Sequence, residues 1–229
     1  IVEALAKIAA MGGDYTKARL TLQEYFEKLG QNPVKWGKPF SALLGAYYTQ
    51  IMTGVAAIGG KDSMSGTFEN MNVPPTLVAF AVDTINVENV VSTEFKKVGS
   101  KVVLIPLKRD KNMLPDFENM HKNFILVHRL AKCGKILAAS TVKTGGIAEA
   151  VSKMCFGNGI GFEFSDTFTG TTDVSRLFVP DYGSIIIEMD KDEDLESIFA
   201  DVEYIVLGNT CEQRYISVDN TKIELDEAV

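Results

Sequence analysis

Apolar residues recur at helical spacing over most of the first quarter of the chain. Three segments show this spacing, over residues 2–9, 15–29 and 40–55, and Asp14 can cap the second. The pattern therefore predicts three amphipathic helices. The side chains expected on the core face of the third helix are Leu43, Leu44, Tyr47, Ile51 and Met52.

Later segments combine short apolar runs with further helical patterns. Strands are predicted over residues 76–82, 101–106, 135–140, 177–179, 184–189 and 204–207, with a closing hairpin over 216–218 and 222–225. Helices are predicted over residues 117–132, 147–156 and 194–200. Strands and helices do not alternate strictly, which favours an α+β, or mixed α/β, fold.

A loss of periodicity over residues 86–100 indicates a domain boundary. This segment gains charge and ends in Gly99, and we place the boundary near residues 88–94. The expected domains are residues 1–90, as the last part of a nucleotide-binding domain, and residues 91–229, as a companion domain.

Composition and charge argue against several classes of function. A net charge of -7, without a basic stripe, argues against nucleic-acid binding. No apolar run reaches the roughly 18 residues that a membrane-spanning helix needs, and Ile1 begins inside a periodic pattern without a signal peptide. Cys133, Cys155 and Cys211 are odd in number and widely spaced, which predicts reduced thiols. We expect a cytoplasmic protein and a chain that begins inside a longer one.

Several polar and aromatic residues have simpler structural interpretations. His121 and His128 are seven residues apart on one predicted helix face, without a nearby acid or cysteine at metal-ligand spacing. Trp36 is expected to anchor a loop, and the acidic tract 190–194 to sit at a helix start, where carboxylates favour the helix dipole.

The stretch Ala-Ile-Gly-Gly-Lys-Asp-Ser-Met-Ser at 57–65 carries the clearest candidate chemistry. A glycine pair in a tight connection can bring backbone N–H groups close to an anion, Lys61 supplies a cation, and Ser63 supplies a donor. The spacing does not match a Walker P-loop. An ordinary glycine-rich turn is the alternative.

Four motifs carry a family resemblance. They are GKDSMS at 60–65, PPTLVAFA at 74–81, KTGGIAEA at 143–150 and PDYGS at 180–184. Together they resemble phosphoribosylformylglycinamidine synthase of purine biosynthesis, in its large glutaminase-fused form. The chain resembles the end of the second synthetase half, within the aminoimidazole ribonucleotide synthase-like superfamily.

The resemblance implies an ATP-dependent carbon–nitrogen ligase that uses ATP and Mg. In such an enzyme the amide oxygen of formylglycinamide ribonucleotide is activated by phosphoryl transfer, and glutamine-derived ammonia gives the amidine. Gly60 and Lys61 would then bind nucleotide phosphate, while Ser63 and Asp62 would contact the ribonucleotide or a cation. The small form of the family has an Asn metal ligand where Lys61 stands, so Lys61 departs from that pattern.

The resemblance also implies a second, auxiliary nucleotide site, to which Gly145 and Gly146 would contribute; the same pair can also simply open a helix. The family's Glu-Ala-Leu-x-Asn here ends in Lys7, and its His-Asp-x-Ser-Asp is replaced by residues 140–144, Ser-Thr-Val-Lys-Thr. Glu3 is the remaining metal candidate. We expect no auxiliary Mg-ADP here, with Lys7 and Lys143 pairing with Glu3 or Glu149 instead.

The expected partners follow from what the chain lacks. No Gly-x-Cys-x-Gly nucleophile motif occurs, so glutamine hydrolysis would need a glutaminase domain, and the remaining synthetase half would complete the site. The apolar helices predict a homodimer for the isolated chain, which we expect to be inactive. Two alternatives stay open: a non-catalytic structural half, or another ATP-using member of the superfamily.

Overall fold

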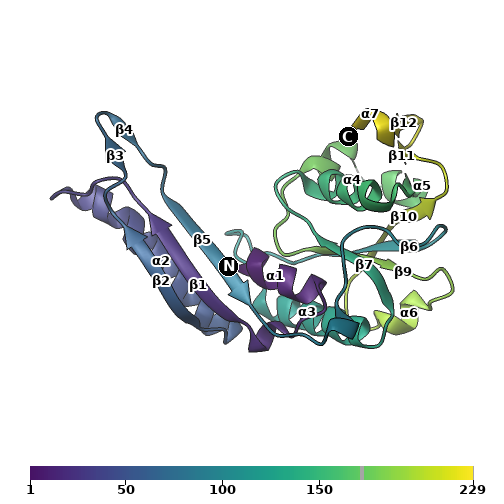
Figure 1. The fold of residues 1–229 in the computed structure, drawn as a ribbon, viewed down its shortest axis with the longest axis horizontal. Coiled ribbons are helices and arrows are strands. Elements are labelled where there is room, and N and C mark those ends of the chain that lie inside the picture. Colours follow the sequence, from purple (N-terminus) through teal and green to yellow (C-terminus); the bar gives the residue numbers. More distant parts are fainter. Residues whose placement is uncertain (171–172, 229) are drawn as a thin grey trace.

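The computed structural model describes residues 1–170 and 173–228 and contains an elongated lobe and a compact part (Figure 1). Both parts combine helices with sheets, so the fold is mixed α/β. The lobe projects from one side of the compact part, and α1 (Val2–Ala10) lies between them. A helix long and apolar enough to cross a membrane is absent from the described residues.

The elongated lobe is built on a three-stranded sheet with the order β2-β1-β5. Its strands are β1 (Arg19–Tyr25), β2 (Ala57–Ser63) and β5 (Thr76–Val82). β2 runs parallel to β1, and a parallel pair needs a crossover connection, which α2 (Pro33–Thr53) supplies. A short hairpin of β3 (Thr67–Phe68) and β4 (Met71–Asn72) forms the tip of the lobe (Figure 1).

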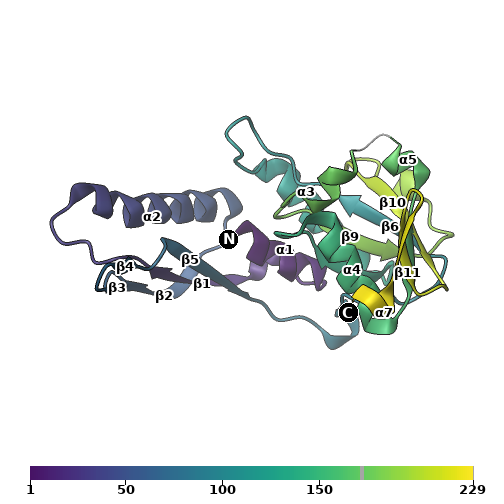
Figure 2. The same ribbon diagram turned by 90° about the horizontal axis from the view of Figure 1, so that it is seen from above.

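Local signals fix both ends of α2. The Asn32 side chain accepts a hydrogen bond from the Val34 N–H at 2.9 Å, and Pro33 occupies the first helical turn. Gly54 ends the helix in the left-handed conformation, with φ of 70°. From above, α2 runs along one face of the lobe's sheet (Figure 2).

The compact part contains a seven-stranded mixed sheet with the order β12-β11-β8-β10-β6-β9-β7. Its strands are β6 (Lys101–Ile105), β7 (Ile136–Thr141), β8 (Gly161–Phe164), β9 (Ile185–Met189), β10 (Ile205–Cys211), β11 (Tyr215–Val218) and β12 (Thr221–Glu224). The longer helices are α3 (Phe117–Lys132) and α4 (Gly146–Asn158). The short ones are η1 (Tyr15–Lys17), η2 (Val87–Asn89), α5 (Asp166–Thr169), η3 (Val174–Phe178), α6 (Leu195–Ile198) and α7 (Leu225–Ala228).

Each face of this sheet has its own apolar core. Val103 and Ile105 of β6 pack with α1 and α3 on one face, while Val102 and Leu104 pack with α4 on the other. This division follows from the alternation of side chains along a strand. Because α1 belongs to the first core, it joins the N-terminal segment to the compact part; the division near residue 90 remains a prediction.

Most predicted elements are confirmed, including the helix over 117–132 and the strand over 76–82. The helix predicted over 15–29 is wrong, because η1 and strand β1 occupy this segment. Leu20 and Leu22 also fit a period of two, and β2 and β5 offer hydrogen-bond partners on both sides of β1. The strand predicted over 177–179 is wrong as well, because η3 ends at Phe178.

The predicted core face of α2 is also wrong. Only Pro39 and Ala46 of this helix are buried. The helix buries only these small residues, and its large side chains remain largely exposed. The exposed set includes Leu43, Leu44, Tyr47, Ile51 and Met52.

Candidate functional site

The Gly-Gly-Lys-Asp-Ser stretch forms strand β2, at the edge of the lobe's sheet, and the predicted tight turn is wrong. Gly60 is needed for close approach: a Cβ atom there would lie 2.4 Å from the Leu22 carbonyl oxygen of β1. Its φ lies outside the positive range, so the left-handed freedom of glycine is not used. An edge strand still presents unpaired backbone N–H groups, which can bind a ligand.

One face of β2 carries Lys61 and Ser63. The Lys61 ammonium lies 5.3 Å from the centroid of the Tyr25 ring, in cation–π geometry, and contacts the Asp62 carbonyl oxygen at 3.4 Å. Among the described residues it has no carboxylate partner. The Ser63 and Ser65 hydroxyls are hydrogen-bonded at 3.2 Å. This face therefore offers an unpaired cation and hydroxyl donors, a combination suited to an anion.

Asp62 lies on the opposite face of β2, because consecutive strand residues point to opposite sides. It lines a cavity of about 410 Å³ between α2 and the sheet. Glu24 of β1, its register partner across the parallel pair, lines the same cavity. Burial and the nearby Asp62 carboxylate raise the pKa of Glu24. Sequence analysis missed Glu24 because it placed this residue in a helix.

Gly145 and Gly146 open α4, as predicted, but the protein itself occupies this helix start. The Gly145 N–H donates to the Glu149 carboxylate at 2.8 Å. Gly146 has φ of 70°, and a Cβ atom there would lie 2.3 Å from the Leu177 carbonyl oxygen. The chain around Leu177 thus packs closely against the glycine pair.

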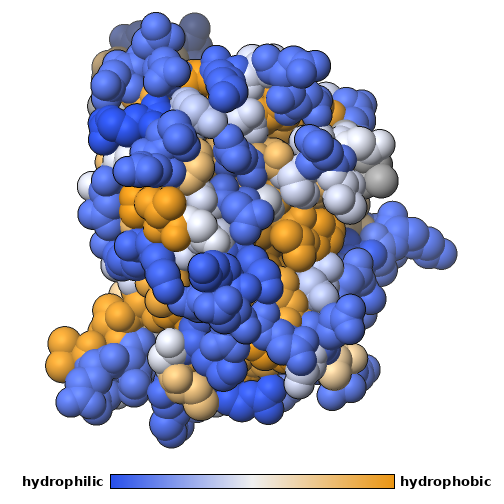
Figure 3. Space-filling model, turned by 90° about the vertical axis from the view of Figure 1, so that its right-hand side faces the viewer, coloured by the Kyte–Doolittle hydropathy of each residue, from blue (hydrophilic) through white to orange (hydrophobic). Residues whose placement is uncertain are grey.

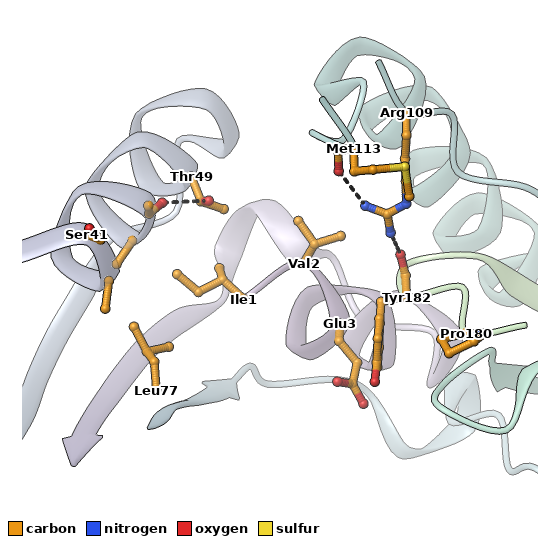
Figure 4. A pocket seen from close by; sticks show the side chains of 13 residues that line it. Ile1, Val2, Glu3, Ser41, Thr49, Leu77, Arg109, Met113, Pro180 and Tyr182 are labelled. Atoms are coloured by element: carbon orange, nitrogen blue, oxygen red, sulfur yellow. Dashed lines mark hydrogen bonds between the residues drawn. The ribbon is translucent and has the colours of Figure 1, made fainter. Parts of the chain in front are cut away.

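Glu3 lies at the start of α1, where it pairs with Lys7 at 2.8 Å, as expected. It lines a cleft of about 750 Å³ between the lobe and the compact part, beside Tyr182 and Arg109 (Figure 4). The Tyr182 hydroxyl is hydrogen-bonded to the Thr144 hydroxyl at 2.8 Å. Glu3 and the segment before α4 therefore meet at one cleft.

Arg109 and Tyr182 are residues of this cleft that the sequence analysis missed. The Arg109 guanidinium donates to the Tyr182 carbonyl oxygen and, at 3.3 Å, to the Met113 carbonyl oxygen. Tyr182 belongs to the PDYGS motif, which was a usable signal. Arg109 lies in a charged loop without a distinguishing pattern.

These residues do not fit an auxiliary magnesium–nucleotide group. The Gly145 N–H and the Glu3 carboxylate both have partners within the chain. The expected Lys143–Glu149 pair is wrong, because Glu149 pairs with Lys153 at 2.5 Å. The described residues hold no group of three His, Cys, Asp or Glu side chains that could bind a metal ion.

The two histidines have structural partners. His121 Nδ1 and the Tyr15 hydroxyl are hydrogen-bonded at 2.7 Å, and His128 Nδ1 donates to the Gly12 carbonyl oxygen at 2.8 Å. Both contacts join α3 to the segment after α1. The tract 190–194 is structural too, because Asp190 pairs with Lys97 and Asp194 caps α6.

Comparison with known proteins gives relatives in sequence and in fold. No family model matches the sequence. The chain is homologous to the phosphoribosylformylglycinamidine synthase subunit PurL of Thermoplasma volcanium, with 28% identity over 180 residues. The match covers 69% of this chain but 23% of the relative, so the chain corresponds to about a quarter of that subunit.

Solved structures share the fold across almost the whole chain. Thermotoga maritima PurL complexed with FGAR superposes with a TM-score of 0.72 at 11% identity, covering 97% of this chain and 40% of that chain. The hydrogenase maturation protein HypE in complex with ATP superposes with a TM-score of 0.68 at 11% identity, covering 98% and 77%. The chain therefore has the fold of PurL and HypE.

Proposed function

We propose that this chain is part of the synthetase region of an ATP-dependent phosphoribosylformylglycinamidine synthase. The observation that carries the proposal is Lys61, which lies within a GKDSMS motif on an exposed edge strand and has no carboxylate partner among the described residues. The sequence homology to PurL supports the same assignment. ATP, Mg and formylglycinamide ribonucleotide are the proposed ligands of the full-length protein, which we place in the cytoplasm.

Different residues of β2 would contact different parts of the ligands. Lys61 would balance phosphate charge, and the edge-strand amides around Gly60 would donate to phosphate oxygens. Ser63, on the same face as Lys61, would donate to the ribonucleotide. Asp62 is not part of this phosphate-binding set, because it faces α2. Gly145, Gly146 and Glu3 are not part of it either, because their polar groups have internal partners or close packing.

The proposed partners are the remaining synthetase half and a glutaminase domain that supplies ammonia. Figure 3 shows that the end face of the compact part is mostly hydrophilic. In contrast, α2 exposes many large apolar side chains, which a protein partner would cover. In the isolated chain we propose that a second copy covers this face, giving a homodimer that lacks synthetase activity.

The test is Lys61→Ala in the full-length protein. Loss of a charge-assisted contact of about 1.5–3 kcal/mol should lower synthetase turnover at least about tenfold and leave glutaminase activity unchanged. Lys222→Ala is the matched control, because Lys222 also sits over a tyrosine ring, 4.0 Å from the Tyr215 centroid, but on β12. Ser63→Ala should mainly raise KM for the ribonucleotide. An unchanged turnover in Lys61→Ala would contradict the proposal.

A second candidate is another ATP-using enzyme of the same superfamily. The observation that favours it is the fold, because HypE in complex with ATP superposes over 98% of this chain with a TM-score of 0.68. ATP consumption by the full-length protein without formylglycinamide ribonucleotide would favour this candidate. A third alternative, a non-catalytic structural half, predicts that substitutions on β2 leave turnover unchanged.

A further inference from the structure

The cavity between α2 and the lobe's sheet contains two carboxylates without partners. Glu24 is 6% exposed, and its carboxylate has no hydrogen bond or ion pair among residues 1–170 and 173–228. Asp62, its register partner on β2, also lacks a side-chain partner there. Neighbouring strands lie about 4.8 Å apart, so the two side chains share one wall of the cavity. Asp62 is exposed where it lines the cavity, whereas Glu24 is buried, and burial of a carboxylate is costly unless a positive charge or hydrogen-bond donors compensate it.

The described residues supply no cation to this pair. The nearest lysines of α2 are Lys35 and Lys38, and both pair with Glu27, Lys35 at 2.7 Å. Lys61 points to the other face of β2, over Tyr25. A cation that pairs with Glu24 and Asp62 would therefore come from outside this part of the chain.

The remaining walls indicate which kind of cation fits. They are apolar and aromatic, with Trp36, Phe40 and Leu43 from α2 and Leu22 from β1. The Trp36 indole N–H donates to the Gly30 carbonyl oxygen at 3.0 Å, which holds the ring in place. A hydrated metal ion prefers six or more oxygen ligands, whereas aromatic and aliphatic walls favour an ammonium or guanidinium head with an aliphatic body.

We propose that this cavity is a binding site for a small organic cation, an aliphatic amine or guanidine whose head bridges Glu24 and Asp62. Its aliphatic body would lie against Phe40 and Leu43, and Trp36 would contact the cation. The volume of about 410 Å³ is within the range of small-molecule sites, about 300–1,000 Å³. The site lies on the other face of the sheet from Lys61, so this inference does not depend on the proposed function.

Trp36 is the single tryptophan of the chain, so its fluorescence reports directly on this cavity. We would titrate the protein with n-butylammonium and n-butylguanidinium at constant ionic strength, and with n-butanol as the neutral analogue and magnesium chloride as the metal. The expected result is a saturable change with the two organic cations, at least about tenfold tighter than any change with butanol or magnesium.

Three variants locate the binding. Glu24→Gln and Asp62→Asn should each weaken binding of the organic cations at least about tenfold, measured by fluorescence and by calorimetry. Asp192→Asn removes the same charge from an exposed loop of the compact part and should change nothing. Circular dichroism confirms that each variant is folded.

Three results would overturn the proposal. They are the absence of saturable binding in the unsubstituted protein, an equal response to butanol, and tighter binding of magnesium than of the amines. The comparison of the four ligands uses the unsubstituted chain, so its outcome does not depend on whether a variant folds.

Discussion

The Glu149 carboxylate accepts a hydrogen bond from the Gly145 N–H at 2.8 Å, so an anion of the chain itself occupies the N-terminus of α4. Lys153, one turn later, pairs with the same carboxylate at 2.5 Å. A helix N-terminus ordinarily attracts anions through its free N–H groups and its dipole. Here the Glu149 carboxylate takes the place of an external anion, and the glycine pair has a structural role at the start of the helix.

Substitution of Glu149 by glutamine should destabilise the protein at neutral pH. The Lys153 ammonium and the Gly145 N–H lower the pKa of Glu149, so its contribution is present above the unfolded value near 4.5 and is lost as pH falls through the lower folded value. We expect a loss of about 1 kcal/mol, typical of a helix cap. Urea unfolding at neutral and acidic pH would measure it.

The difference between wild type and Glu149→Gln should disappear at low pH, since both side chains are then neutral. Lys122→Gln serves as the control, because its pair with Glu118 is also spaced i,i+4 but, among the described residues, no backbone N–H donates to Glu118. A pH-independent loss of stability would show that packing, rather than charge, explains the effect.

Substitution of Glu24 by glutamine should instead stabilise the protein at neutral pH. Burial and Asp62 raise the pKa of Glu24, so its favourable contribution is present below the unfolded value near 4.5 and is lost as pH rises through the folded value. At neutral pH, glutamine removes a buried charge and its amide can donate to Asp62. The free energy of unfolding should rise at pH 7 and change little at acidic pH; a loss at pH 7 would contradict this.

The sequence predicted the compact part better than the lobe. Strands such as β6 are apolar on both sides because two cores cover the sheet, and this gives a strong local signal. β1 was mistaken for a helix because its apolar residues fit both periods, and pairing with β2 and β5 decided between them. The cavity carboxylates depend on that pairing: Glu24 and Asp62 are 38 positions apart and meet only through the β1–β2 register.

The placement of the motif residues also depended on the element that carries them. Lys61 and Asp62 are adjacent in sequence, but a strand separates them onto opposite faces, whereas a turn could have directed both to one ligand. Glu3 and Lys7 were correctly paired because helical spacing alone brings them together. Sequence patterns thus predict contacts within one element more reliably than contacts between elements.

A charge on the outer face of α2 should reduce self-association. Tyr47 is 61% exposed within the apolar set of this helix, and Tyr47→Lys would place an ammonium in any interface that covers it. We expect the isolated chain to shift from dimer to monomer by light scattering. Ile223→Lys on β12 is the matched control, because Ile223 is also exposed but lies on the compact part. A wild-type monomer would contradict the proposed interface.

Cys133 and Cys155 should differ widely in reactivity towards a thiol reagent. Cys133 is exposed after α3, whereas Cys155 belongs to α4 and is buried in the core, and burial raises the pKa of its thiol to about 12. Because the thiolate is the reactive form, about one Cys155 thiol in ten thousand would be ionised at pH 8 even if the reagent could reach it. Cys133 should therefore react first and Cys155 only as fast as the core opens.

Mass spectrometry of timed samples would assign each site, and Cys133→Ser should remove the fast phase without altering the slow one. Rapid modification of Cys155 in the folded protein would show that α4 opens readily, which is inconsistent with the close packing of Leu177 against Gly146.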